Sequence, residues 1–421
     1  MSSPQAPKGT YDLLPDEAAR RDAVVATAAR LFGAYGYRHI VTPEFEETGL
    51  FERGVGEATD IVRKEMYTFL DKGERSLTLR PEGTAPICRA YVEHGMHKWP
   101  QPVKLWYYCP MFRYEKPQAG RYREHYQIGA EAIGSADPAV DAEVIALLAA
   151  IFAELGVEGV TLNMNSMGDA ACRPAYVEKL RAYLQGREDE LCGECRERMT
   201  LNPLRTFDCK VESCRAVLDE APRIGDHLCP HCREHFDTVL ELVRAAGLEP
   251  RLEFRLVRGL DYYTRTTFEF NSDRLGAQSG VGGGGRYDGL VEQIGGAPTP
   301  GVGWGSGVER IALAMREQPL PDTAPDVFVV SFTPEARRAA FDAAQALRGA
   351  GLRADLDLAG RSPKGQFKQA GRSGAPLAAL VGLEELDAGL VRLRVMAGGE
   401  ESDVPRDALA AAVRELLGTG A

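Results

Sequence analysis

Two strand-like segments, residues 103–112 and 125–133, dominate the first third of this 421-residue sequence. Both are rich in aromatic and β-branched residues, and the polar loop between them contains Pro117 and Gly120. This pattern predicts one long antiparallel hairpin. Further strand-like segments at residues 160–164, 252–257 and 266–270 extend it. The expected fold class is therefore α+β, with a core built on an antiparallel sheet.

Two helices are signalled around the hairpin. Apolar residues recur at helical spacing from Asp16 to Gly36, after Pro15, which we expect to precede the helix. Asp137 followed by Pro138 predicts a capped helix start, and the apolar stretch that follows ends at Gly156.

The length of the chain favours two or three domains. We assign residues 1–325 to one domain, with a Cys-rich and Arg-rich helical insertion at about residues 168–250. Residues 326–421 alternate strands and helices, as a small α/β domain would. Strands are expected at 327–332 and 354–358, and Thr333 is expected to cap a helix that starts at Pro334.

Composition excludes several classes of protein. A net charge of −11 argues against a protein that coats nucleic acid without selectivity, because such binding depends on Lys and Arg. No apolar segment is long enough to span a bilayer, and residues 1–16 have no export signal. We expect a soluble, cytoplasmic protein with no membrane partner.

Strand alternation places polar groups together on the hairpin. One face of the first strand and its continuation carries Tyr107, Cys109, Met111 and Arg113, and one face of the second carries Gln127, Gly129 and Glu131. A cation, an amide and a carboxylate could converge there, with Gly129 leaving room for a ligand. The alternative is a solvated hairpin whose charges only keep it soluble.

Two Arg-containing segments add possible phosphate sites. The hairpin loop contains Lys116, Arg121 and Arg123, and guanidinium groups bind phosphate through two hydrogen bonds. Glycines alternate from 301 to 307 before a helical segment that holds Arg310 in its first turn, where a nucleotide phosphate could bind. A Gly-rich turn packed on a neighbouring element is the plainer interpretation.

These segments occur in the order of motifs 2 and 3 of class II aminoacyl-tRNA synthetases, which the chain resembles. GYR at residues 36–38 and IVTPE at 40–44 are similar to motif 1. LVRGLDYYT at 256–264, GGGRYDGL at 283–290 and LRPEGT at 79–84 resemble the histidyl-tRNA synthetase family within that class. The resemblance covers nearly the whole chain and implies an antiparallel catalytic core with a C-terminal anticodon-binding domain.

The resemblance implies a reaction. A member of this family would activate L-histidine with ATP, releasing pyrophosphate, and transfer histidine to the 3′-terminal adenosine of tRNA(His). Mg²⁺ would accompany ATP, without a dedicated protein cage. The motif 1 segment would form a homodimer interface, and Pro43 in that segment is typical of a strand edge.

The resemblance also implies roles for individual residues. Glu82 and Gln127 would hold the α-ammonium of histidine, with Thr84 beside them, and Glu131 and Tyr263 would contact the imidazole, with Tyr262 nearby. The expected ATP contacts and catalytic cations are Arg113 and Arg258 at the α-phosphate, Arg310 at the γ-phosphate, and Arg121. Arg258 and Arg113 would stabilise charge in the transition state. The glycines from 280 to 285 would lie under the substrate, or would serve sheet packing.

The family places its anticodon-binding domain at the C-terminus. There Arg361, Lys364, Lys368 and Arg372 recur at helical spacing. We expect tRNA contacts at Arg361, Lys364 and Lys368, and in the hairpin loop at Lys116, Gln118 and Arg123. A solvated helix face is the alternative.

Six of the nine cysteines lie between residues 192 and 232, and they include two C-x-x-C pairs. A structural zinc on Cys192, Cys195, Cys229 and Cys232 is one interpretation. The gap of 33 residues between the pairs exceeds the usual zinc-ribbon spacing, and reduced, packed thiols are the alternative.

Two other functions share some of these features. One is a regulatory paralogue that controls histidine biosynthesis without charging tRNA, although such proteins typically lack the C-terminal domain. The other is a zinc-dependent RNA-binding module, which would leave Glu82, Arg113, Gln127, Arg258 and Arg310 without a joint explanation.

Overall fold

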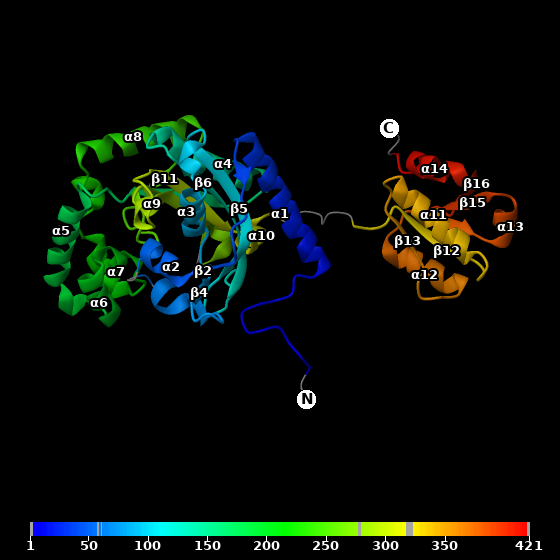
Figure 1. Cartoon of the computed structure of the whole chain (residues 1–421), viewed down its shortest axis with the longest axis horizontal. Helices are drawn as coiled ribbons and strands as arrows, with labels where there is room; N and C mark the ends of the chain where they lie inside the picture. The colour runs from blue at the N-terminus through cyan, green and yellow to red at the C-terminus, as the bar shows by residue number, and fades with distance from the viewer. Residues whose placement is uncertain (1–2, 57–58, 60, 277–278, 317–322, 419–421) are drawn as a thin grey trace. The chain divides into compact units, whose positions relative to one another are not determined.

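The computed structural model describes residues 3–56, 59, 61–276, 279–316 and 323–418. The chain folds into two compact units, Met1–Leu320 and Pro321–Ala421 (Figure 1). Each unit has its own hydrophobic core. The units are described separately.

The first unit is built on an eight-stranded sheet of order β1-β5-β6-β11-β10-β9-β7-β8. In that order the strands are Arg38–His39, Val103–Phe112, Glu124–Ile133, Gly301–Gly307, Gly280–Arg286, Thr264–Ser272, Val160–Ser166 and Arg251–Leu252. The two outermost pairings, β1 with β5 and β7 with β8, are parallel, and the pairings between them are antiparallel. The predicted antiparallel sheet is therefore confirmed.

The hairpin of β5 and β6 forms as expected. Tyr107 pairs with Gly129 and Cys109 pairs with Gln127, so the two predicted polar faces are one face of the sheet. The strand expected at residues 252–257 is wrong, because β8 ends at Leu252 and the chain turns away immediately afterwards. The backbone of residues 253–257 forms a turn and a loop that lead to Arg258.

Four helices cover the face of the sheet opposite the hairpin's polar side chains. They are α1 (Pro15–Ala34), α4 (Pro138–Glu154), α8 (Pro230–Ala245) and α10 (Val308–Ala314). Ile128, Ala130 and Ala132 of β6 are buried in the core that these helices share with the sheet. Asp137 caps α4 by accepting the backbone N–H of Ala139, as predicted. Pro15, expected before the first helix, is instead its first residue, where a missing N–H costs nothing.

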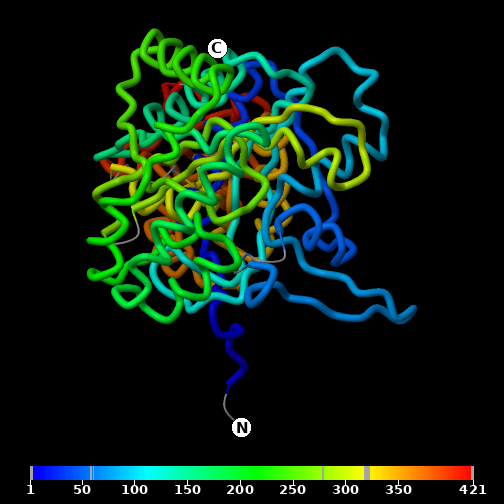
Figure 2. Tube along the Cα trace, turned by 90° about the vertical axis from the view of Figure 1, so that its left-hand side faces the viewer, coloured from blue at the N-terminus to red at the C-terminus, as the bar shows by residue number. Residues whose placement is uncertain are grey.

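The other face of the sheet is covered by shorter elements. These are α2 (Thr48–Val55), α3 (Thr84–Glu93), α9 (Leu290–Gln293) and a small antiparallel sheet of β2 (Phe45–Glu47), β4 (Ser76–Leu79) and β3 (Tyr67–Leu70). The β3–β4 hairpin projects from the first unit (Figure 2). A second core, which includes Tyr107, Tyr262 and Tyr287, lies on this side.

The insertion has a core of its own. The helices α5 (Arg173–Gln185), α6 (Gly193–Leu201) and α7 (Glu212–Asp219) lie together beside the sheet (Figure 1), and their buried residues form a separate cluster. The helix α8 follows them in sequence, but Phe236, Val239, Leu240 and Val243 pack in the main core. The separately packed part of the insertion thus ends before α8.

The second unit has a five-stranded sheet of order β13-β12-β14-β15-β16. The strands, in that order, are Ala354–Leu356, Val327–Ser331, Leu377–Val381, Leu390–Val395 and Glu401–Pro405, and the helices are α11 (Arg337–Gly349), α12 (Pro363–Ser373), α13 (Leu383–Asp387) and α14 (Leu409–Leu416). The predicted helix start at Pro334 is wrong. Thr333 caps a preceding turn through the N–H of Ala336, and the helix begins at Arg337.

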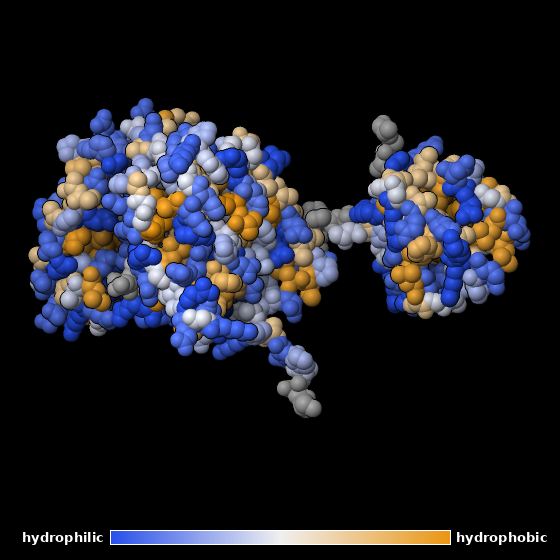
Figure 3. Space-filling model, in the orientation of Figure 1, coloured by the Kyte–Doolittle hydropathy of each residue, from blue (hydrophilic) through white to orange (hydrophobic). Residues whose placement is uncertain are grey.

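Surface character agrees with these cores. On the face shown in Figure 3, hydrophilic residues predominate on each unit, and apolar patches lie among these residues. Within the described residues, no helix combines the length and the apolar character that a membrane crossing requires.

A fully buried ion pair joins the sheet to α4. The guanidinium of Arg286 on β10 and the carboxylate of Asp141 on α4 both have no exposed side-chain surface. His235 on α8 contacts the same carboxylate at 3.4 Å. Burial alone would raise the pKa of Asp141, but the His235 hydrogen bond and the Arg286 charge hold it below its usual value.

Replacing Arg286 by Met should destabilise the first unit by about 3–5 kcal/mol, because it leaves the Asp141 charge buried without its main partner. Urea unfolding followed by tryptophan fluorescence measures this unit alone, since Trp99, Trp106 and Trp304 all lie in it. Arg30→Met, which breaks the exposed pair with Glu154, is the matched control and should cost less than about 1 kcal/mol. Equal losses in the two variants would contradict the prediction.

Candidate active site

Glu82 is fixed at the start of α3. Its carboxylate accepts the backbone N–H groups of Thr84 and Ala85, both at 2.8 Å, which are unpaired donors of the first helical turn. The hydroxyl of Tyr262 donates to the same carboxylate at 3.3 Å. Glu82 is buried, and burial raises its pKa although these N–H groups oppose the shift.

Glu131 lies deeper on β6 and has no exposed surface. The hydroxyls of Thr84 and Tyr287 donate to its two oxygens at 2.8 and 2.6 Å. Burial raises its pKa to about 8, so the carboxyl is mostly protonated at neutral pH. A Cβ on Gly303, its partner on β11, would lie 1.8 Å from the carboxylate, so this position requires glycine.

The space over Gly129 is filled by protein. A Cβ there would lie 2.2 Å from the ring of Tyr107, and a Cβ on Gly83 would lie 2.6 Å from the same ring. The prediction that Gly129 makes room for a ligand is therefore wrong. Both glycines make room for Tyr107, which packs between β6 and the start of α3.

A cavity of about 330 Å³ lies beside Gln127. Its lining combines arginines with carboxylates and backbone from the hairpin, β9, β10 and β11: Arg113, Glu115, Gly120, Arg121, Tyr122, His125, Gln127, Glu269, Asn271, Ser279, Gly280, Gly307 and Arg310. Arg113, Arg121, Arg310 and Gln127 were all predicted from the sequence to be site residues. The structure brings them to one cavity.

Each arginine of this cavity is oriented by hydrogen bonds. Arg113 donates from Nε to the carbonyl of Pro81 at 2.8 Å, and Arg310 donates to the carbonyl of Gly280 at 2.6 Å. Arg121 contacts Glu115 at 2.8 Å. Burial, with the charge of Arg113, lowers the pKa of His125 to about 3, so its ring is neutral. Fixed cations that line a cavity favour an anionic ligand.

Arg258 lies in an adjoining cavity of about 810 Å³, which shares Arg121, Glu269 and Asn271 with the first. The Nη1 of Arg258 donates to the carboxylate of Glu269 at 2.6 Å. A Cβ on Gly283 would lie 3.2 Å from this guanidinium and 2.5 Å from the Phe268 carbonyl. A Cβ on Gly285 would meet the ring of Tyr263. The β10 glycines therefore serve sheet packing and the placement of these two side chains.

The predicted histidine-site residues divide into two groups. Glu82, Thr84, Glu131 and Tyr262 form one hydrogen-bonded network. Tyr263 packs on Tyr262 with ring centroids 4.7 Å apart but is not among the donors to Glu131 in the described residues. Gln127 lines the arginine cavity, so β6 connects the two regions.

The predicted RNA contacts also divide. Lys116, Gln118, Lys364 and Lys368 are exposed, the last two on α12. Arg123 instead anchors the N-terminal segment, donating to the Lys8 carbonyl at 3.3 Å and stacking over Tyr114. Arg361 lies before α12 and pairs with Asp357 at 2.7 Å. The expectation that Arg361 shares a helix face with Lys364 and Lys368 is therefore wrong, because α12 begins at Pro363.

The predicted zinc ligand set is wrong. Cys192 and Cys195 at the start of α6 lie with Cys209 and Cys214, whereas Cys229 and Cys232 at the start of α8 lie with Asp169 and Cys172. The two pairs belong to different helices, one in the insertion core and one in the main core. They form two separate clusters.

Several site residues were missed by sequence reasoning. Tyr287 is part of the GGGRYDGL string and Tyr107 is on the predicted polar face, so both could have been found. Cys209 follows Cys195 after 13 residues, which is a usual zinc-ligand gap, and Cys214 follows Cys209 after four. His125 alternates with Gln127 in the predicted strand and could also have been found. Glu269 had no comparable signal, because only the folded sheet brings it to the arginines.

A buried cluster of hydrogen-bonded carboxyl groups and an arginine-lined cavity lie on one antiparallel sheet, and a small α/β unit follows. This is the arrangement of a class II aminoacyl-tRNA ligase. The "Histidyl-tRNA synthetase" family pattern matches residues 9–311, and an "Anticodon binding domain" pattern matches residues 326–416.

Full-length relatives agree. The chain is 50% identical to a protein named histidine–tRNA ligase from Moorella thermoacetica, over 98% of this chain and 99% of the relative. It is 52% identical to one of the same name from Rubrobacter xylanophilus, over 94% and 96%. The crystal structure of apo S. aureus histidyl-tRNA synthetase superposes with a TM-score of 0.82 at 37% identity, covering 98% and 100%. The chain belongs to the histidyl-tRNA synthetase family. These matches do not favour the non-charging alternative.

The pKa of Glu131 makes stability depend on pH. Because it is raised from 4.5 to about 8, the folded state binds one more proton than the unfolded state between these values. Its contribution to stability is complete at low pH and is lost as pH rises, by up to about 1.4 kcal/mol per unit. Urea unfolding at both ends of this window should give a steeper decline for the wild type than for Glu131→Gln. Identical slopes would contradict the assignment.

Proposed function

We propose that the chain catalyses both steps of histidine–tRNA ligation, with L-histidine, ATP and tRNA(His) as substrates. In the first step the histidine carboxylate attacks the α-phosphorus of ATP and pyrophosphate leaves. In the second step the 3′-terminal ribose hydroxyl of the tRNA attacks the adenylate, and AMP leaves. Both steps depend on positioning and electrostatics.

Histidine would occupy the region between Glu82 and Glu131. The carboxylate of Glu82 and the amide oxygen of Gln127 are acceptors for the α-ammonium, and Thr84 holds Glu131 in place. Glu131 would pair with one ring nitrogen of the histidine. The hydroxyl of Tyr263 would pair with the other ring nitrogen, with Tyr262 beside it. A buried polar pocket rejects apolar side chains, because its groups would then be left unpaired.

ATP would occupy the arginine-lined cavity. Arg113 would contact the α-phosphate, Arg310 the γ-phosphate and Arg121 a further phosphate oxygen, while each is held by the contacts described above. Mg²⁺ would be held mainly by the β- and γ-phosphates, where it neutralises charge. The carboxylates of Glu115 and Glu269 line the same cavity and provide the oxygen ligands that this ion prefers.

Arg258 would act at the reacting phosphorus. Its guanidinium is anchored to Glu269 at the boundary between the two cavities, so its position is set before substrate binds. A fixed cation stabilises the charge that accumulates on the phosphoryl oxygens in the transition state without reorganisation. The ring of His125 lies 3.3 Å from the amide nitrogen of Gln127 and is neutral, so it adds no further positive charge to this cavity.

The observation that carries this proposal is that both regions draw residues from one face of β6. Gln127 borders the arginine cavity, and Glu131, four residues along β6, is buried against Thr84 and Tyr287. That separation is about 13 Å along the strand. Histidine joined to a nucleotide phosphate would have to reach from one region to the other past the Tyr107 ring that covers Gly129. A phosphate-binding module alone would have no use for Glu131.

The tRNA would make further contacts outside this site. The exposed Lys364 and Lys368 on α12, with Lys116 and Gln118 in the hairpin loop, are proposed to contact tRNA, where Lys residues bind phosphates. Arg123 and Arg361 would have to exchange their present partners to join them.

Homodimerisation is proposed through the motif 1 side of the first unit. Val41, Phe45, Phe69 and Leu70 are exposed apolar residues on or beside the three-stranded sheet. A cluster of exposed apolar side chains is typical of a subunit interface. We propose a cytoplasmic homodimer, with twice the 45.9 kDa chain mass in light scattering.

Amino-acid-dependent exchange of labelled pyrophosphate into ATP tests the function directly. Purified full-length protein without tRNA should catalyse exchange with histidine and with no other proteinogenic amino acid, because Glu131 and the tyrosine hydroxyl together require a ring with two hydrogen-bonding nitrogens. Exchange with another amino acid would overturn the pocket assignment. The absence of any exchange would overturn the ligase proposal.

Arg258→Met and Arg113→Met should each lower kcat for this exchange by about 10²- to 10³-fold, because each removes a cation from the developing charge. Arg274→Met, at a side chain 61% exposed and paired with Glu158, is the control and should retain wild-type kcat. An effect of the Arg258 variant confined to the KM for histidine would assign this residue to ground-state binding instead.

A further inference from the structure

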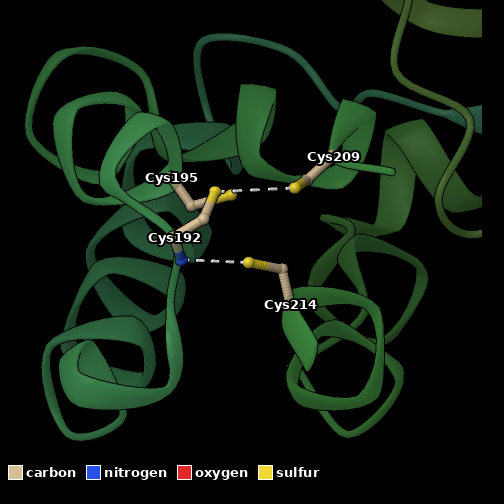
Figure 4. Close-up of side chains that lie close together, drawn as sticks. All are labelled: Cys192, Cys195, Cys209 and Cys214. Carbon is tan, nitrogen blue, oxygen red and sulfur yellow. Dashed lines mark hydrogen bonds between the residues drawn. The ribbon is translucent and has the colours of Figure 1, made fainter. Parts of the chain in front are cut away.

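The insertion contains four thiols around one point. Cys192 and Cys195 lie at the start of α6, Cys209 follows the short helix Pro203–Asp208, and Cys214 lies in α7 (Figure 4). All four Sγ atoms are within 4.8 Å of one another. All nine cysteines lie among the described residues, and none of them forms a disulfide. Residues from three separate elements therefore place four sulfur atoms in the space of one coordination shell.

The geometry of this cluster fits a single tetrahedral ion. Two thiolates on one zinc, with Zn–S bonds of about 2.3 Å, lie about 3.8 Å apart. The Sγ atoms of Cys192 and Cys209 are 3.9 Å apart. The backbone N–H of Cys192 donates to the Sγ of Cys214 at 3.1 Å, which is the kind of contact that stabilises a metal-bound thiolate (Figure 4). The spacing C-x₂-C-x₁₃-C-x₄-C is also typical of zinc sites.

A second cluster lies where the chain passes between the sheet and the insertion. Asp169 and Cys172 are on the segment from β7 into α5, and Cys229 and Cys232 begin α8, on the return segment. Their ligand atoms also lie within 4.8 Å of one another. The backbone N–H of Asp169 points to the Cys172 sulfur at 3.4 Å. This set offers three thiolates and one carboxylate oxygen.

We propose that the insertion binds two structural zinc ions, one on Cys192, Cys195, Cys209 and Cys214, and one on Asp169, Cys172, Cys229 and Cys232. Each thiol loses its proton to solvent as zinc binds. With four protein ligands each, both sites are closed, and neither leaves a coordination position for catalysis. The first ion joins the three elements of the insertion core, and the second joins its two connections to the sheet.

Zinc fits better than the alternatives. Hard cations such as Mg²⁺ and Ca²⁺ take oxygen ligands, so a thiol-dominated set excludes them. Iron–sulfur clusters hold their ligands around several metal atoms, whereas these sulfur atoms surround the space of one. Packed thiols alone would not require both C-x-x-C pairs to begin a helix and each to meet two further ligands.

The second ion would also support the active site. Arg173, the residue after Cys172, donates to the carbonyl of Tyr263 at 2.8 Å and to that of Met167 at 3.0 Å. Fixing Cys172 therefore fixes the cation that holds the backbone of the 256–264 segment. This is a positioning effect, because neither set of zinc ligands belongs to the proposed substrate region.

The test is the metal content of the purified full-length protein, measured by inductively coupled plasma mass spectrometry. The wild type should hold two zinc ions per chain. Cys209→Ser and Cys172→Ser should each hold one, because each removes a ligand of a different site. Cys109→Ser, at a buried cysteine outside both clusters, should still hold two.

A measurement on the unmodified protein covers variants that fail to fold. Zinc X-ray absorption should show a first shell dominated by sulfur with a minor oxygen component. Wild-type protein without zinc, or with iron in its place, would overturn the proposal. A wild type that holds one zinc, with none left in either Cys209→Ser or Cys172→Ser, would overturn the two-site assignment. None of these outcomes depends on ligase activity, so the proposal and the proposed function can fail separately.

Discussion

The alternation of side chains along β6 is the constraint on which the first unit depends. Ile128, Ala130 and Ala132 point into the core under the four covering helices, and Gln127, Gly129 and Glu131 point to the other side. A shift of one residue in register would exchange these sets, burying a carboxylate among apolar helices. The same residues that anchor the sheet to its helices thus fix the register of the candidate site.

A carboxyl group in the protein interior is tolerated only if its hydrogen bonds are made. Glu131 meets this condition through the hydroxyls of Thr84 and Tyr287, which come from α3 and from the end of β10. Gly303 must lack a side chain for the carboxyl to fit at all. The glycines of β10 and β11 are therefore part of the site's architecture, since they let buried polar side chains lie directly on the sheet.

The sequence predicted features that depend on local chemistry or on strand periodicity. The cap at Asp137, the β5–β6 hairpin and its common polar face all follow from neighbouring residues. The errors arose where a side chain occupies a space or finds a partner that the local pattern does not specify. Tyr107 fills the volume expected for a ligand at Gly129, and Asp357 pairs with Arg361. The helix expected at Pro334 begins at Arg337 because Thr333 closes a turn first.

The cysteines show the same limit most clearly. The predicted zinc site combined the two C-x-x-C motifs as one set of ligands. The helices that these motifs begin pack in different cores. The insertion core is small and relies on several thiols, Cys195 and Cys214 among them, for its buried surface. A core of this size gains little from apolar burial alone, and a closed metal site adds binding free energy directly to folding. Placing a second such site where the insertion joins the sheet would make its orientation, as well as its fold, depend on the metal.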